Sequence, residues 1–252
     1  DGKIFTFKEL KKYFKNYAAK NKNRKKSTRW PETLKIIEGD RVLDFGCWKG
    51  SQTYTIGELG SNEVIGIDTR QSDIDIANDF FKLPNITYEV RDIFTNPFPD
   101  SYFDCIVFTE VIEHVENPID YLREFFRILK PGGFLILSTP NATSLKNFLY
   151  AISYRKKEKR EKILSDISNE DKHTGTHLEH IFNWDFPTLA RLIITAGFRI
   201  NHHSFMRSGP IRISLFGKKI ELIQGESKIL KFVPTLMAVS YTHLTLPTTP
   251  YV

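Results

Sequence analysis

Three acidic residues, each close to the end of a predicted strand, could together bind a positively charged ligand. Asp44 lies in the apolar stretch Val-Leu-Asp-Phe, Asp68 directly follows Val-Ile-Gly-Ile, and Asp92 follows a third strand-like stretch. In an open parallel sheet, ligands bind in the crevice beyond the carboxyl ends of the strands. The three carboxylates should therefore face one crevice, where they would favour a cationic ligand.

The turn Asp44-Phe-Gly-Cys-Trp-Lys-Gly50 argues against two common classes of nucleotide site. A dinucleotide fingerprint requires glycines at the first, third and sixth positions, where this chain has Gly46, Trp48 and Ser51. The Gly-Lys-Ser/Thr sequence of a phosphate loop is also missing. Gly46 and Gly50 remain, and both permit close approach of the backbone to a ligand.

The spacing of the apolar segments predicts an α/β fold. Continuously apolar strands indicate burial on both faces, and hence a mostly parallel sheet. Alternation of such strands with helices predicts a Rossmann-like, doubly wound sheet. The strands are expected at residues 41–45, 64–67, 86–90, 103–108 and 134–137, and the helices at residues 51–59, 72–81 and 119–129.

Further elements are expected around this sheet. Residues 144–168 have a helical pattern, a polar loop with several histidines follows at residues 173–180, and a helix is expected at residues 185–196. A sixth strand is expected at residues 198–204 and a helical stretch near residues 220–232, with no other strand before residue 239.

Three longer segments extend the pattern that begins with the glycine turn. They are Phe98-Pro-Asp-Ser-Tyr-Phe-Asp104, Glu110-Val-Ile-Glu-His-Val-Glu-Asn-Pro118 and Leu122-Arg-Glu-Phe-Phe-Arg-Ile-Leu-Lys-Pro-Gly-Gly133. In order and spacing, residues 41–141 and 189–198 resemble class I S-adenosylmethionine (SAM) dependent methyltransferases of the ubiquinone- and biotin-pathway type. The chain departs from that family at Trp48, where the first motif usually has its middle glycine.

The resemblance implies that SAM is the cofactor and S-adenosylhomocysteine (SAH) the product. It implies that Asp68 accepts both ribose hydroxyls, that Asp92 binds the adenine amino group, and that Ile93 lines the adenine pocket. The expected SAM-binding residues are Asp44, Gly46, Cys47, Gly50, Asp68, Thr69, Asp92, Ile93 and Thr109.

Histidines are the candidates for a base that an oxygen or nitrogen acceptor can require. His177 and His180 lie in the loop where the family forms its acceptor site, and we predict them as catalytic residues; a solvated loop is the alternative. For His114, which follows the fourth strand, a structural role is favoured. The spacing of His173, His177 and His180 could also suit a metal. No accompanying carboxylate or cysteine pattern supports one, and we predict no metal site.

The implied domain organisation has five parts. They are a basic helical extension (1–38), a SAM-binding core (39–140), a helical lid with the acceptor loop (141–197), a C-terminal strand and helix of the core (198–238), and a final segment (239–252). The final segment, VSYTHLTLPTTPYV, resembles the translated read-through of a sequencing adapter. The family usually inserts an antiparallel seventh strand between the fifth and sixth. We expect the native one to be missing, leaving either an open slot or residues 237–245 within it.

Charge and composition leave several functions open. Residues 1–30 contain eleven Lys or Arg and two acids, which suits either a solvated helix face or an arm that binds an anionic partner. The leading prediction is a methyltransferase for a small-molecule acceptor. The alternatives are an RNA or protein methyltransferase, and a SAM-binding partner subunit without activity. Nucleic acid is disfavoured because no Asn/Asp-Pro-Pro-aromatic sequence follows the fourth strand.

Composition also indicates the setting of the protein. No apolar run reaches the roughly 18 residues of a membrane helix, so no membrane span is expected. Cys47 and Cys105 are too few for a disulfide framework, which favours a cytoplasmic location. We expect a monomer or a homodimer.

Overall fold

The computed structural model describes residues 37, 40–143, 147, 152, 154–168, 180–207, 211–215, 218–223 and 238–245. Nearly all of the predicted basic extension therefore lies outside the described residues, as do His173 and His177. None of the helices within the described ranges is long and apolar enough to cross a membrane.

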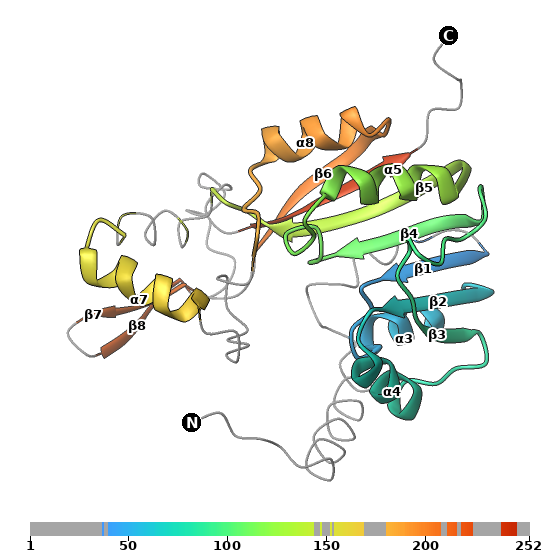
Figure 1. Ribbon diagram of the computed structural model, residues 1–252, viewed down its shortest axis with the longest axis horizontal. Coiled ribbons are helices and arrows are strands. Elements are labelled where there is room, and N and C mark those ends of the chain that lie inside the picture. Colours follow the sequence, from blue (N-terminus) through green and yellow to red (C-terminus); the bar gives the residue numbers. More distant parts are fainter. Residues whose placement is uncertain are drawn as a thin grey trace.

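A seven-stranded sheet forms the centre of the described structure (Figure 1). The spatial order is β3-β2-β1-β4-β5-β9-β6, and β3, β2, β1, β4 and β5 are mutually parallel. The predicted Rossmann-like, doubly wound α/β fold is thereby confirmed. The strands are β1 (Arg41–Phe45), β2 (Glu63–Asp68), β3 (Ile86–Val90), β4 (Phe103–Thr109), β5 (Leu129–Pro140), β6 (Arg199–Arg207) and β9 (Ala238–Thr245).

Helices cover both faces of this sheet, with α3 and α4 on one side and α5 and α8 on the other (Figure 1). Strand side chains alternate between the faces, so Leu43 belongs to the cluster with Phe125 of α5, whereas Val42 packs with Ile56 of α3. Burial on both faces explains the continuously apolar strands. The described helices are α3 (Ser51–Glu58), α4 (Gln71–Phe80), α5 (Pro118–Ile128), α7 (Lys157–Ser168) and α8 (Phe186–Thr195).

The strand order creates the place for a ligand. Consecutive strands β1, β2 and β3 extend the sheet in one direction, whereas β4 and β5 lie on the other side of β1. The helices after β1 and β4 therefore diverge to opposite faces and leave a crevice above the carboxyl ends of the two strands. This switch point brings the end of β1 between the ends of β2 and β4.

The region after β6 differs from the sequence-based expectation. Residues 220–223, predicted as the start of a helix, belong to strand β8 (Lys218–Ile223), which pairs with β7 (Ile211–Leu215) in an antiparallel hairpin outside the main sheet. The helical prediction for residues 220–223 is wrong, and so is the expectation of no other strand before residue 239. Ile220 and Leu222 alternate with Lys219 and Glu221, and this period of two favours a strand.

The slot between β5 and β6 is filled by the end of the chain. Strand β9 runs antiparallel to both neighbours, with Pro140 opposite Val239 on one side and Arg207 opposite Ala238 on the other. The prediction left two outcomes open, an open slot or residues 237–245 within it; among the described residues, Ala238–Thr245 occupy the slot as a strand. Backbone pairing on both sides explains how a Thr-rich segment can serve there, because the ladder hydrogen bonds do not depend on side-chain identity.

Candidate cofactor site

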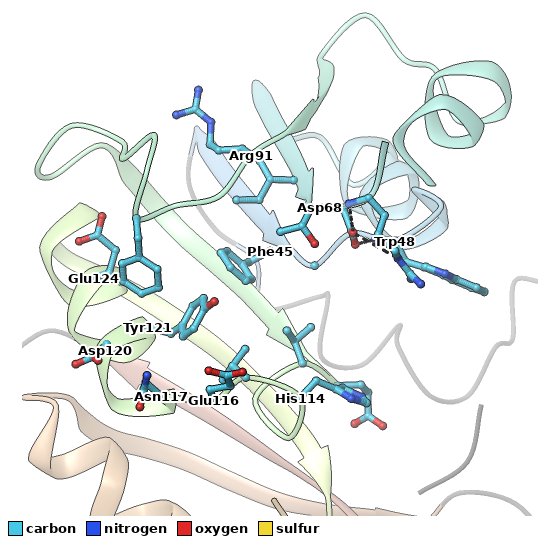
Figure 2. A pocket seen from close by; sticks show the side chains of 18 of the residues that line it. Phe45, Trp48, Asp68, Arg91, His114, Glu116, Asn117, Asp120, Tyr121 and Glu124 are labelled. Carbon is cyan, nitrogen blue, oxygen red and sulfur yellow. Dashed lines mark hydrogen bonds and ion pairs between the residues drawn. The ribbon is translucent and has the colours of Figure 1, made fainter. Parts of the chain in front are cut away.

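A cavity of about 1450 Å³ opens at the carboxyl ends of the parallel strands (Figure 2). Its wall includes Gly46 and Trp48 from the turn after β1, Asp68 at the end of β2, and Glu110 after β4. Helix α5 closes the opposite side, where Tyr121 lies. The cavity therefore occupies the position that the strand order predicts for a ligand.

The turn after β1 has a left-handed backbone at Gly46, Trp48 and Gly50, with φ angles of 73°, 50° and 83°. A Cβ atom on Gly46 would lie 2.6 Å from Cγ2 of Val111, so this position also requires glycine for packing. Trp48 takes the conformation that a glycine would take more easily, and its N–H donates to Oδ2 of Asp68 at 3.0 Å. The turn thus keeps its shape although the middle glycine is replaced.

Asp68 is held rigidly at the edge of the cavity. Its Oδ1 accepts the N–H of Arg70 and its Oδ2 accepts the N–H of Trp48, both at 3.0 Å (Figure 2). The side chain is 13% exposed, so it is shielded but still accessible. Each oxygen of a carboxylate can accept more than one hydrogen bond, so both oxygens keep capacity for a ligand. A fixed carboxylate with two such acceptor oxygens is suited to a vicinal diol.

Asp44 lies deeper than Asp68 and does not line the cavity. It is only 1% exposed, and the hydroxyl of Thr53 donates to its Oδ2 at 2.6 Å. Burial raises the pKa of Asp44 to about 7; the Thr53 hydrogen bond opposes this change, and the negative charge of Asp68 adds to it. Near neutral pH, a cation in the adjacent crevice would favour the charged form of this carboxyl group.

The end of β3 contributes a different residue from the one singled out in the sequence. Asp92 is exposed, and its Oδ1 accepts the N–H of Phe94 at 2.8 Å. Ile93 is 1% exposed and belongs to the hydrophobic core. The cavity wall at this point is formed by Phe94, which is 48% exposed. The only feature of the sequence that could have pointed to Phe94 as a wall residue is an aromatic side chain shortly after a predicted strand end.

The remaining expected cofactor residues take varied positions. Thr69 lines the cavity beside Asp68. Cys47 is buried, and burial raises the pKa of its thiol above the usual range. Thr109, at the end of β4, is mostly buried and donates to Oε1 of Gln52 at 3.0 Å. The buried Nε2 of Gln52 has no hydrogen-bond partner within the described ranges, so both of its N–H groups are unpaired next to the turn.

The loop after β4 and the segment before α8 bring together residues that are far apart in the sequence. The rings of His114 and His180 lie 4.8 Å apart at an angle of 81°. The backbone carbonyl of Glu113 accepts the N–H groups of Ile181 and Phe182, which fixes the segment after His180 to the loop after β4. Sequence reasoning assigned His114 and His180 to separate roles and did not anticipate their contact.

Glu113 adds a buried carboxylate to this group. Its Oε2 accepts the hydroxyl of Thr139 at 2.9 Å, and potential metal-ligating atoms of Glu113, His114 and His180 all lie within 4.8 Å of one another. Exposed or buried acid–histidine groups also occur without a metal, so the expectation of no metal site stays a prediction. His177 lies outside the described residues, and its predicted role is not tested.

Comparisons with known proteins identify the class of protein. Residues 5–203 match the Methyltransferase domain family, and the chain belongs to this family. Solved structures of similar fold include an S-adenosylmethionine-dependent methyltransferase from Mesorhizobium loti, with 17% identity, a TM-score of 0.57, and coverage of 85% of this chain and 96% of that one. A methyltransferase from Bacillus halodurans has 15% identity, a TM-score of 0.59, and coverage of 86% and 98%. S-adenosylmethionine is the cofactor that this family membership implies.

Curated relatives match a little under half of the chain. A mitochondrial ubiquinone biosynthesis O-methyltransferase from Dictyostelium discoideum is 34% identical over 121 residues, 43% of this chain and 38% of the relative. A ubiquinone biosynthesis O-methyltransferase from Cereibacter sphaeroides is 36% identical over 118 residues, 46% of this chain and 47% of the relative. The chain thus spans less than half the length of these two relatives.

The residues present fit SAM. The ligand carries a ribose diol, for which Asp68 offers two acceptor oxygens fixed by backbone N–H groups. It carries no phosphate, in agreement with a turn that lacks a phosphate loop. Its sulfonium and amino groups are cationic, in agreement with the carboxylates at the strand ends.

Proposed function

We propose that this protein transfers the methyl group of SAM to an oxygen, nitrogen or carbon atom of a small molecule, or of a glycan or lipid precursor. The observation that carries the proposal is Asp68, whose carboxylate is fixed by two backbone N–H groups at the wall of the cavity. The printed names of the ubiquinone-pathway relatives support a small-molecule acceptor.

Within this proposal, Asp68 accepts the ribose hydroxyls of SAM. Gly46, Gly50 and Cys47 belong to the turn that would hold the methionine part, and Thr69 and Thr109 would contribute from the ends of β2 and β4. Asp44 supplies a buried negative charge beneath this turn, where it would favour the cationic groups of SAM. Asp92 would bind the adenine amino group, and Ile93, which is buried, would back the adenine pocket from the core.

SAM supplies an already activated methyl group, so the protein's contribution is positioning, exclusion of water and removal of a proton. The cavity wall would hold the acceptor close to the methyl group and would shield both from solvent. Where the acceptor is a hydroxyl or an amine, a nitrogen of His180, next to His114, accepts the proton. The Glu113 carbonyl keeps the segment carrying His180 against the loop after β4.

Two other functions remain to be separated from this one. An RNA or protein methyltransferase would need a basic binding surface, and the basic residues 1–30 lie outside the described residues. A SAM-binding partner subunit would bind the cofactor without turnover. The presence of Asp44, Asp68 and Asp92 and of the outer glycines Gly46 and Gly50 argues against the latter, although Trp48 replaces the middle glycine.

The test combines cofactor binding with turnover. Calorimetric titration with SAH should show binding to the wild-type protein and a loss of about tenfold to a hundredfold in Asp68→Ala, because a charged hydrogen-bond acceptor is removed. Asp79→Ala, at an exposed acid on α4, is the matched control and should bind as the wild type does. A screen of phenolic, amine and glycan acceptors for SAH release then tests catalysis. Binding without turnover on any acceptor, including RNA and protein, would favour the partner-subunit alternative.

A further inference from the structure

The side chain of Tyr88 reaches the turn after β1 from a neighbouring part of the sheet. Tyr88 lies in the middle of β3, the outermost of the parallel strands, and is only 9% exposed. It belongs to one buried cluster with Cys47 of the turn and Ala77 of α4, the helix that lies near β3 in Figure 1. A tyrosine from a peripheral strand therefore contacts the turn that is expected to meet the cofactor.

The hydroxyl group of Tyr88 joins this turn to the end of α4. It lies 3.1 Å from the carbonyl oxygen of Gly50 and 2.9 Å from that of Phe81, which directly follows α4, and it can donate its one hydrogen to either. Burial, with the nearby Asp44 carboxylate, raises the pKa of the Tyr88 phenol well above its ordinary value. The phenol therefore keeps its hydrogen at neutral pH.

Two glycines make room for this side chain. A Cβ atom on Gly50 would lie 2.8 Å from the hydroxyl oxygen of Tyr88, and a Cβ atom on Gly66 would lie 2.9 Å from Cδ1 of the ring. Gly66 is the residue opposite Tyr88 in the pairing of β2 with β3. Because neither glycine has a side chain, the ring lies close to the sheet and its hydroxyl group reaches the carbonyl of Gly50.

The carbonyl group of Gly50 is a point at which the conformation of the turn is set. It also accepts the N–H of Tyr54, which is the first hydrogen bond of α3, and Gly50 itself has a left-handed backbone with φ at 83°. Two residues earlier, the N–H of Trp48 donates to Asp68. A hydrogen bond to the Gly50 carbonyl therefore restrains the segment between the cavity and α3.

We propose that Tyr88 is a positioning residue for the cofactor: by holding the carbonyl of Gly50, its hydroxyl group fixes the turn in the conformation that receives the methionine part of SAM. Tyr88 does not line the cavity, so it acts only through the turn. This inference rests on the proposed function, because it requires SAM at the turn. The nucleoside part of SAM should depend less on Tyr88, since Asp68 belongs to β2 and is also held by the N–H of Arg70.

The experiment compares two ligands by calorimetry and needs no acceptor. The ligands are SAH and methylthioadenosine, which has the same nucleoside and sulfur atom but lacks the amino-acid group. Tyr88→Phe keeps the ring and removes only the hydroxyl group, so it should weaken SAH binding by about threefold to tenfold, as for the loss of one hydrogen bond. Its affinity for methylthioadenosine should stay within about twofold of the wild type. Asp68→Ala should weaken the binding of both ligands.

Tyr54→Phe is the matched control. Tyr54 packs against the same buried cluster, but its hydroxyl group interacts with Glu58 of its own helix, so this variant should bind both ligands as the wild type does. Melting curves without ligand show that each variant is folded at the temperature of the titration. Amide hydrogen exchange gives a readout without any ligand: residues 46–50 should exchange faster in Tyr88→Phe, whereas β1 and β4 should be unchanged.

The outcomes distinguish this inference from the proposed function. If Asp68→Ala loses SAH affinity but folded Tyr88→Phe binds SAH as the wild type does, the positioning role is overturned and the proposed function stands. Equal losses of affinity for SAH and methylthioadenosine in Tyr88→Phe would indicate a general loosening of the fold and would also overturn it. If the wild type does not bind SAH, the proposed function itself fails.

Discussion

Replacing Asp44 by asparagine should make the folded protein less sensitive to pH. The carboxyl group is 1% exposed, and burial raises its pKa from an ordinary 3.8 to about 7. Between these two values the folded protein keeps a proton that the unfolded chain has released. The unfolded state then binds fewer protons, so the free energy of unfolding falls as the pH rises.

The size of the effect follows from the two pKa values. Each unit of pKa difference corresponds to about 1.4 kcal/mol, so a shift from 3.8 to about 7 amounts to about 4 kcal/mol. The wild-type protein has this contribution in full below pH 3.8 and loses it progressively until the pH passes about 7. The amide introduced by Asp44→Asn cannot ionise and can still meet the Thr53 hydroxyl, so the variant should not show this loss.

The assay is urea unfolding of both proteins at intervals from pH 5 to pH 8. The difference in the free energy of unfolding should grow with pH in favour of Asp44→Asn, whereas Asp79→Asn, at an exposed acid, should follow the wild type. Stability curves of Asp44→Asn and wild type that stay parallel across this range would refute the reasoning. A positively charged ligand is attracted to Asp44 only when this carboxyl group is ionised, and ionisation increases with pH. The affinity of the wild type for SAH or SAM should therefore rise with pH more than that of Asp44→Asn.

Four further predictions concern the turn after β1, the hydrophobic core, strand β9 and His180. Gly50→Ala should cost about 1–3 kcal/mol by thermal melting, because φ is 83° and the new Cβ would lie 2.7 Å from that of Ala77. Phe125→Ala should cost about 3–5 kcal/mol, since its ring is fully buried; a nearly unchanged urea midpoint would contradict this. Deleting residues 238–252 should lower the melting temperature and promote aggregation by light scattering, because β5 and β6 lose their shared partner. His180→Ala should slow turnover without changing SAH affinity. An unchanged rate would contradict the role of His180 as a base and would mean that its loop only connects two elements.

The core of the fold was predictable because its signals are local. Each parallel strand is a short apolar run, and β1 and β3 have the bounds predicted from these runs. Strand β8 was missed because its alternation of apolar and charged residues is short and lies in a stretch of mixed pattern. The position of Asp68 at the end of β2 also followed from its neighbours in the sequence, since a strand end needs no tertiary information.

The full shape of the site could not be predicted from the sequence. Phe45, Phe94 and Tyr121 follow or lie on three different elements, and their perpendicular arrangement depends on how α5 packs against the sheet. The contact of His114 with His180 likewise depends on the hydrogen bonds that join Glu113 to Ile181 and Phe182. Neither arrangement has a signature in spacing along the chain.

The sequence by itself determined the alternation of buried strands and helices, the carboxylates at the strand ends and the absence of a phosphate loop, because these depend on residue type and short-range order. Tertiary structure decided that Asp44 is buried whereas Asp68 lines the cavity, although both lie at strand ends. It also decided that Trp48 adopts a glycine-like backbone, through a hydrogen bond to Asp68 twenty residues further along the chain. The physical reason is that burial, pKa and backbone strain are set by neighbours in space, which the order of the residues does not reveal.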